Sequence, residues 1–131
     1  MKSVNKEYKK IIKISEAAKY SLTFYENVKN NADSIVKDYK LASTLNKKSN
    51  MKLGARGIAY KSYQDAKAYG EDKSNSKRML YLSDKYMDTV NFLDGVAYLK
   101  NKDFNNAQKR LNKIKDSTLK RVLSNRIKQL K

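Results

Sequence analysis

Several residue types that shape protein chemistry are missing from this sequence or rare in it. The 131 residues include no proline, cysteine, histidine or tryptophan, and glycine occurs only four times. Proline and glycine break helices, and strand-rich domains need both residues at their many turns. Their scarcity therefore predicts an all-α fold.

The lack of cysteine and histidine restricts the chemistry that the chain can perform. Without cysteine there is no disulfide framework and no thiolate metal site. Without histidine the chain lacks the side chain that most catalytic triads, zinc sites and proton shuttles use near neutral pH. The acids are mostly isolated and form no Asp-x-Asp-x-Asp-Gly calcium loop. We therefore expect no enzyme activity, no metal and no cofactor, and the compartment stays open.

Long apolar runs are absent as well. No stretch approaches the ~20 apolar residues needed to span a bilayer, and the N-terminus lacks the apolar core of a signal peptide. The sequence leaves open whether a leader was removed ahead of Met1. The length fits one domain, which we expect to cover residues 1–131.

What the sequence does contain is positive charge. Thirty basic residues face 13 acidic ones, a formal net charge of +17, and all but five of the basic residues are lysine. A charge of this size attracts phosphates, anionic lipids or an acidic protein. The alternative is composition drift in a genome rich in A and T, because phosphate recognition tends to favour the forked donors of arginine. The sequence leaves both explanations open.

Apolar residues spaced by three and four predict a succession of helices. The expected helices cover residues 4–28, 32–45, 51–69, 104–114 and 119–130, and apolar periodicity also runs through residues 79–97. That last stretch is either one long helix or two that meet near Asp88, whose side chain would then act as an N-cap.

Polar segments are expected to separate these helices. They lie at residues 46–50, 71–76, 101–103 and 116–118, and an asparagine at 30 or 31 is expected to cap the second helix. Connections this short predict antiparallel neighbours. The expected architecture is five to six helices in antiparallel hairpins.

Basic residues are concentrated at the C-terminal end of the chain. Residues 109–131 hold nine basic side chains and one acid, Asp116, a net charge of +8. This pattern fits either a solvated helix face or a surface for an anion, since the helix dipole also favours cations near C-termini. The candidate contact residues are Lys109, Arg110, Lys113, Lys120, Arg121, Arg126 and Lys128.

One segment resembles a tetratricopeptide repeat. Gly95 and Tyr98 lie one turn apart, a short turn leads to Phe104, and Ala107 is followed four residues later by Leu111. The resemblance covers residues 91–115, although Asn91, Asp94 and Leu119 stand where the family favours tryptophan, leucine and proline. It implies an array of stacked helical hairpins, and the alternative is an unrelated helical bundle. It also implies that a peptide or partner helix binds the first helices of the pairs, with Asn91 and Tyr98 as contacts.

We therefore expect a non-catalytic module for protein–protein interaction or scaffolding, whose basic residues attract an acidic partner. The main alternative is a nucleic-acid-binding protein that neutralises phosphates with its C-terminal helices. Self-association is a further alternative. Attachment to an anionic membrane is less favoured, because the first expected helix carries acids and few large aromatic residues.

Overall fold

The computed structural model describes residues 22–51 and 73–131, and every regular element in these two ranges is an α-helix. This confirms the all-α prediction. A helix over residues 22–30 is followed by α2 (Ala32–Lys37), α3 (Tyr39–Met51), α5 (Lys73–Lys100), α6 (Phe104–Lys113) and α7 (Ser117–Leu130). Residues 4–21 of the first predicted helix lie outside the described residues. So does the predicted helix 51–69, apart from Met51.

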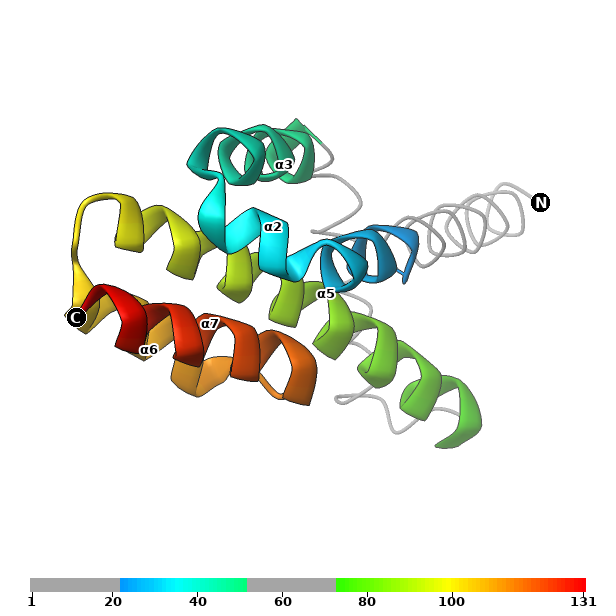
Figure 1. Ribbon diagram of the computed structural model, residues 1–131. Helices are drawn as coiled ribbons and strands as arrows, with labels where there is room; N and C mark the ends of the chain where they lie inside the picture. The colour runs from blue at the N-terminus through cyan, green and yellow to red at the C-terminus, as the bar shows by residue number, and fades with distance from the viewer. Residues whose placement is uncertain (1–21, 52–72) are drawn as a thin grey trace.

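α5 packs against three of the other helices, α3, α6 and α7, whereas α2 packs chiefly against α3 and α7. In Figure 1, α3 lies on one side of α5, and α6 and α7 lie on the other. Between Tyr86 and Leu99 most of its side chains are buried, so it lacks the wide polar face of a surface helix. Each fully buried large side chain contributes on the order of 1.5–3 kcal/mol. Although α5 has 28 residues, no helix in the described ranges is long and apolar enough to cross a membrane.

The single helix predicted over residues 32–45 is wrong, because the chain breaks at Asp38. The backbone there is extended, with φ −119° and ψ 95°, so α2 ends and α3 begins. Asp38 Oδ1 accepts from the backbone N–H groups of Lys40 at 3.0 Å and Leu41 at 3.2 Å. An aspartate that satisfies N–H groups at a helix start favours such a break over a continuous helix.

Two other predictions about helix ends in this region have different outcomes. The second helix begins at Ala32 as predicted, with Asn31 in the N-cap position, but the amide of Asn31 donates to Asn27 and its side chain makes no capping hydrogen bond. α3 continues through residues 46–50, where a polar break was expected. None of these polar residues is proline or glycine, so they extend a helix whose preceding turn is anchored by buried Leu45.

α5 differs from the prediction at its start and confirms one of the two alternatives along its length. It begins at Lys73, so residues 73–76 of the predicted loop are helical. It then continues as one helix past Asp88. Asp88 therefore does not cap a second helix; its carboxylate contacts the segment between α6 and α7.

The connection between α5 and α6 lies at residues 101–103, where the sequence predicts it, whereas the link between α6 and α7 covers residues 114–116 and not the predicted 116–118, because α7 already begins at Ser117. Three residues link α5 to α6, and the Asp103 side chain caps α6 by accepting from the N–H of Asn106 at 3.2 Å. Asp116 caps α7 in the same way, accepting from the N–H of Leu119 at 2.9 Å. Figure 1 shows α6 running back along α5 and α7 returning beside both.

Gly95 lies where α5 is crossed by its neighbours. A Cβ atom at this position would be 2.7 Å from Cδ2 of Leu123 on α7 and 3.7 Å from Cβ of Arg110 on α6. Leu123 is fully buried and has little room to move. Glycine thus allows α7 to approach α5 closely.

Candidate functional site

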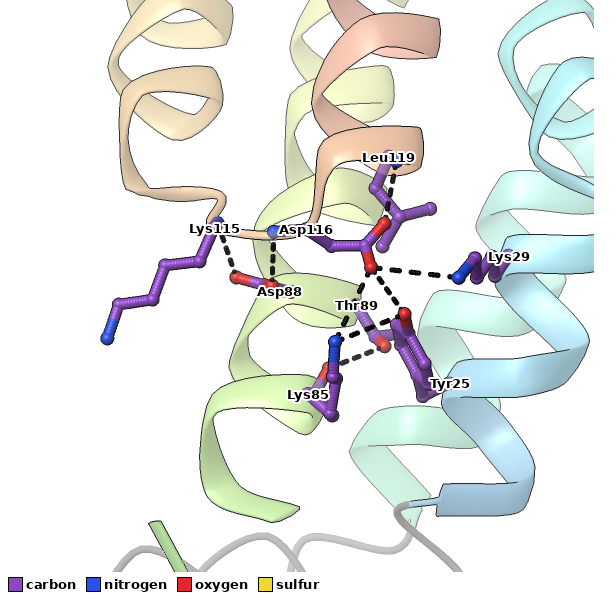
Figure 2. Close-up of polar contacts among 8 residues, drawn as sticks. All are labelled: Tyr25, Lys29, Lys85, Asp88, Thr89, Lys115, Asp116 and Leu119. Carbon is purple, nitrogen blue, oxygen red and sulfur yellow. Dashed lines mark hydrogen bonds and ion pairs between the residues drawn. The ribbon is translucent and has the colours of Figure 1, made fainter. Parts of the chain in front are cut away.

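A cluster of polar side chains lies at the junction of the helix over residues 22–30, α5 and the link between α6 and α7 (Figure 2). This polar cluster consists of Tyr25, Lys29, Lys85, Asp88 and Asp116. Tyr25, Asp88 and Asp116 are only 5%, 3% and 8% exposed. Burying such groups is unfavourable unless each has a polar partner, so their contacts decide the role of the cluster.

Asp116 is the acceptor at the centre of the polar cluster. While its Oδ2 caps α7, its Oδ1 accepts from the hydroxyl of Tyr25. Oδ1 also lies 3.5 Å from Nζ of Lys85 and 4.0 Å from Nζ of Lys29. Lys85 is the stronger ionic partner, because its side chain is 22% exposed against 41% for Lys29 and water screens it less.

Tyr25 and Lys85 also contact each other directly. Nζ of Lys85 donates to the Tyr25 hydroxyl at 3.4 Å and lies 4.8 Å from the centre of its ring. An ammonium near an aromatic ring is attracted by the ring's electron density. Tyr25 therefore connects the helix over residues 22–30 to α5 as well as to Asp116.

Asp88 holds the link between α6 and α7 from the side of α5. Its Oδ1 accepts from the backbone N–H of Lys115 at 2.9 Å and its Oδ2 from that of Asp116 at 2.8 Å. These two backbone groups precede α7 and have no helical partner of their own. Asp88 thereby fixes the backbone that presents the Asp116 side chain to Tyr25.

The two aspartates differ in the direction of their pKa shifts. Burial raises the pKa of Asp88 and outweighs the backbone N–H groups of Lys115 and Asp116, which act to lower it. Burial alone would also raise the pKa of Asp116. Its pKa is nevertheless lowered, because the Tyr25 hydroxyl, the Leu119 N–H and the nearby lysines together stabilise the carboxylate. The pKa of Tyr25 is raised by burial and by its hydrogen bond to Asp116.

These contacts make the polar cluster a device for holding helices together. Its carboxylates bind backbone N–H groups, a hydroxyl and ammonium groups. In the described part of the chain, no group of three or more histidine, cysteine, aspartate or glutamate side chains could hold a metal ion. The arrangement supports positioning of α7.

Sequence reasoning missed this cluster. Tyr25 and Asp116 are 91 positions apart, and Asp88 and Asp116 are 28 apart. Helical periodicity finds neighbours three or four positions apart and carries no signal for such pairs. The available clue was that Asp88 is an acid within an apolar helical stretch, which we considered only as a local cap in one of the two alternatives for that stretch.

The two residues that the repeat resemblance offered as contacts differ in their burial. Asn91 is 4% exposed, and its Oδ1 accepts from Nη1 of Arg110 at 3.3 Å. Arg110 also pairs with Asp94 at 3.6 Å and so covers this edge of α5. Asn91 is therefore not accessible as a contact, whereas Tyr98 is half-buried and packs against the core.

Most of the predicted basic contact residues are exposed on α6 and α7. Helical geometry places Lys109 and Lys113 on the side of α6 opposite its buried residues, and places Arg121 and Lys128 likewise on α7, with Lys120 beside them. We call these five residues the basic outer face. Within the described ranges, none of the five has an acid within ion-pair distance.

Arg126 differs from the other predicted basic contacts. It lies on the inward side of α7 and is half-buried, with Nη1 donating to Oε1 of Gln129 at 3.2 Å. Its Nε is buried and makes no hydrogen bond. Arg126 is therefore excluded from the basic outer face.

No protein family, curated protein or solved structure matches this chain. The resemblance of residues 91–115 to a tetratricopeptide repeat therefore stays a prediction from the sequence. Two of its small residues have a clear packing role, since Gly95 lies against Leu123 and Ala107 is fully buried on α6. Function must be inferred from the side chains themselves.

Proposed function

We propose that the protein is a non-catalytic binding module that holds an acidic protein partner on the basic outer face. The observation that carries this proposal is five exposed cations on two consecutive helices, with no acidic partner among the described residues. A surface of one sign attracts a partner of the opposite sign and speeds their encounter. Such a surface needs a firm support, which the packing of α6 and α7 on α5 supplies.

The charge of the basic outer face is not neutralised by the acids nearby. Asp116, the only acid of residues 109–131, faces inward and binds Tyr25 and Lys85. Asp94 is paired with Arg110, and Asp84 lies 3.3 Å from Nζ of Lys115. These acids of the α5–α7 region therefore contact cations other than the five of the basic outer face.

An acidic protein fits this surface better than a nucleic acid does. Four of the five cations are lysines, whereas bidentate phosphate recognition favours arginine. Phe104 is the only aromatic residue after Tyr98, and it packs against the core, so α6 and α7 offer no exposed ring for stacking on bases. The resemblance to helical-repeat scaffolds supports the same class of partner.

The test compares two variants of equal net charge. One replaces Lys109, Lys113 and Lys120 of the basic outer face by glutamine. The control replaces three exposed lysines of α2 and α3 by glutamine, namely Lys37, Lys40 and Lys47. Each variant loses three charges, from +17 to +14. Affinity capture from a lysate treated with nuclease identifies the retained protein, and its affinity for purified wild-type and variant protein is then measured.

We expect the variant of the basic outer face to bind the captured protein about 10-fold more weakly than the control. Three exposed ion pairs at about 0.5 kcal/mol each give this factor. Equal affinities of the two variants would show that overall charge, and not this surface, attracts the partner. That result would refute the proposal.

Nucleic-acid binding is the second candidate, because the same five cations could neutralise phosphates. In that case retention would be lost on nuclease treatment, and binding to a labelled duplex would fall steeply with salt. Five phosphate contacts on a duplex predict a log–log slope of about −4.5. Failure of the protein to retain any duplex at low salt would remove this candidate.

A further inference from the structure

The turn between α5 and α6 contains a lysine in a conformation that lysine rarely adopts. Lys102 has φ 56°, and it is the only residue other than glycine with positive φ in the described ranges. The N–H of Lys102 donates to the carbonyl of Leu99, and the N–H of Asp103 donates to that of Tyr98, each at 3.0 Å. This pair of bonds ends a helix with a left-handed residue, for which glycine is strongly preferred. The fold therefore does not favour lysine at this position.

The side chain of Lys102 gains no compensating contact within the described residues. It is exposed and takes part in no hydrogen bond or ion pair there. The adjacent acid, Asp103, directs its carboxylate to the backbone and side-chain N–H groups of Asn106, at 3.2 and 2.7 Å. Residues held in sparsely populated backbone conformations cluster at active sites, ligand-binding sites and switch regions.

Lys102 also lies at an end of the molecule that carries other exposed cations. α5 and α7 contact each other and run in the same direction, so their C-terminal ends lie together, beside the turn that contains Lys102 (Figure 1). Lys100, Lys128 and Lys131 are exposed at this end. Cations near helix C-termini complement the helix dipole, which accounts for these three lysines. That effect does not require a lysine in the left-handed position.

We propose that Lys102 is a partner-contact residue, and that the acidic protein segment held by the basic outer face extends across the turn between α5 and α6. This inference rests on the proposed function and adds a contact outside the five residues that define it. Charge complementarity is the basis for the choice of partner, since this end offers four exposed lysines and the acid next to Lys102, Asp103, is engaged in capping α6. Lysine would thus be retained at 102 at the expense of stability.

The experiment measures stability and binding on the same variants of the full chain. Lys102→Gly removes the charge and relieves the backbone, and Lys102→Arg retains both the charge and the backbone conformation. Lys47→Gln is the control for loss of one exposed charge on α3. The binding probe is a fluorescein-labelled poly-glutamate peptide, followed by anisotropy near physiological ionic strength, where charges beyond about 8 Å are largely screened.

We expect Lys102→Gly to raise the melting temperature by about 3–5 °C and to weaken poly-glutamate binding about two- to fivefold. Lys102→Arg should bind as the wild type does, and Lys47→Gln should leave binding nearly unchanged. If Lys102→Gly is no more stable than the wild type, the fold does accommodate lysine well and the inference is wrong. If it is more stable but binds like Lys47→Gln, Lys102 is not a contact, and the inference is likewise wrong.

These failures can be told apart from failure of the proposed function. Lys102 is unchanged in the variant that replaces Lys109, Lys113 and Lys120 by glutamine. Weak probe binding by that variant together with normal binding by Lys102→Gly would uphold the basic outer face and reject Lys102. The reverse pattern would reject the basic outer face and, because the inference rests on it, would reject the extended surface as described.

Discussion

Replacing Asp116 by alanine should destabilise the protein strongly. The substitution removes the N-cap of α7 and the acceptor of the Tyr25 hydroxyl at once. Loss of an aspartate N-cap costs typically about 1 kcal/mol. A buried hydroxyl left without its acceptor costs about 1–3 kcal/mol more. We therefore expect the free energy of unfolding to fall by about 2–4 kcal/mol, a large part of the 5–15 kcal/mol typical of a small domain.

A matched control separates the two contributions. Asp103 caps α6 by accepting from the N–H three residues on, as Asp116 does for α7, but among the described residues its carboxylate accepts only from Asn106. Asp103→Ala should therefore cost only the ~1 kcal/mol of a helix cap. The assay is urea denaturation followed by far-UV circular dichroism, with the slope of the transition checked for constancy between variants. The polar cluster's own contribution is the difference between the two alanine variants.

A double-mutant cycle then tests whether Tyr25 and Asp116 interact. Tyr25→Phe should cost about 1–2 kcal/mol in the wild-type protein, because the hydroxyl donates to a charged acceptor. In the Asp116→Ala background that loss should shrink by about 1 kcal/mol or more. The reasoning would be refuted if Asp116→Ala cost no more than Asp103→Ala, or if the effect of Tyr25→Phe were the same in both backgrounds.

Two further predictions concern packing and pH. Gly95→Ala should destabilise the protein by about 1 kcal/mol, because the clash of the new Cβ atom with Leu123 at 2.7 Å outweighs the better helix propensity of alanine. The loss of stability should be smaller in a Leu123→Ala background. The urea midpoints of the single and double variants measure both effects. Since the pKa of Asp116 is lower in the folded protein than its ordinary 3.8, its stabilising contribution is present above that value and is lost as the pH falls below it. Asp88 contributes to the pH dependence of stability with the opposite sign, because its raised pKa lets the folded protein bind a proton more readily than the unfolded chain does. Asp116→Asn should therefore lose less stability than the wild type between about pH 5 and about pH 3, and equal losses in the two proteins would contradict the assignment.

The helices at the C-terminal end of the chain were the most predictable part of the fold. The predicted polar segments at 101–103 and 116–118 contain Asp103 and Asp116, which are the N-caps of α6 and α7, although α7 begins two residues earlier than expected, at Ser117. Apolar periodicity on either side located the buried faces, with Ala107 and Leu119 both fully buried. In these segments local preference and tertiary packing agree, which is the condition under which sequence patterns succeed.

Prediction was poorer where one residue had two compatible local roles. An aspartate can begin a helix or be carried within one, and the sequence does not distinguish Asp38, which breaks the chain into α2 and α3, from Asp88, which lies within α5. What separates them is tertiary context, because Asp88 has two backbone N–H groups to bind across the core and Asp38 has only its own neighbours. The polar cluster could not be predicted for the same reason.

The structure also changes the meaning of the positive charge. Counting charges along residues 109–131 treats Asp116 as a neutralising partner for the cations around it. In the folded protein Asp116 is 8% exposed and binds cations from the other side of the core, Lys85 and, more weakly, Lys29. Asp116 therefore stabilises the packing of the helices, and it does not neutralise the cations on the outward surface of α6 and α7. Composition drift can supply lysines anywhere on the surface, but it does not explain why the one acid of this stretch is directed inward, and that arrangement favours the basic outer face as a binding surface.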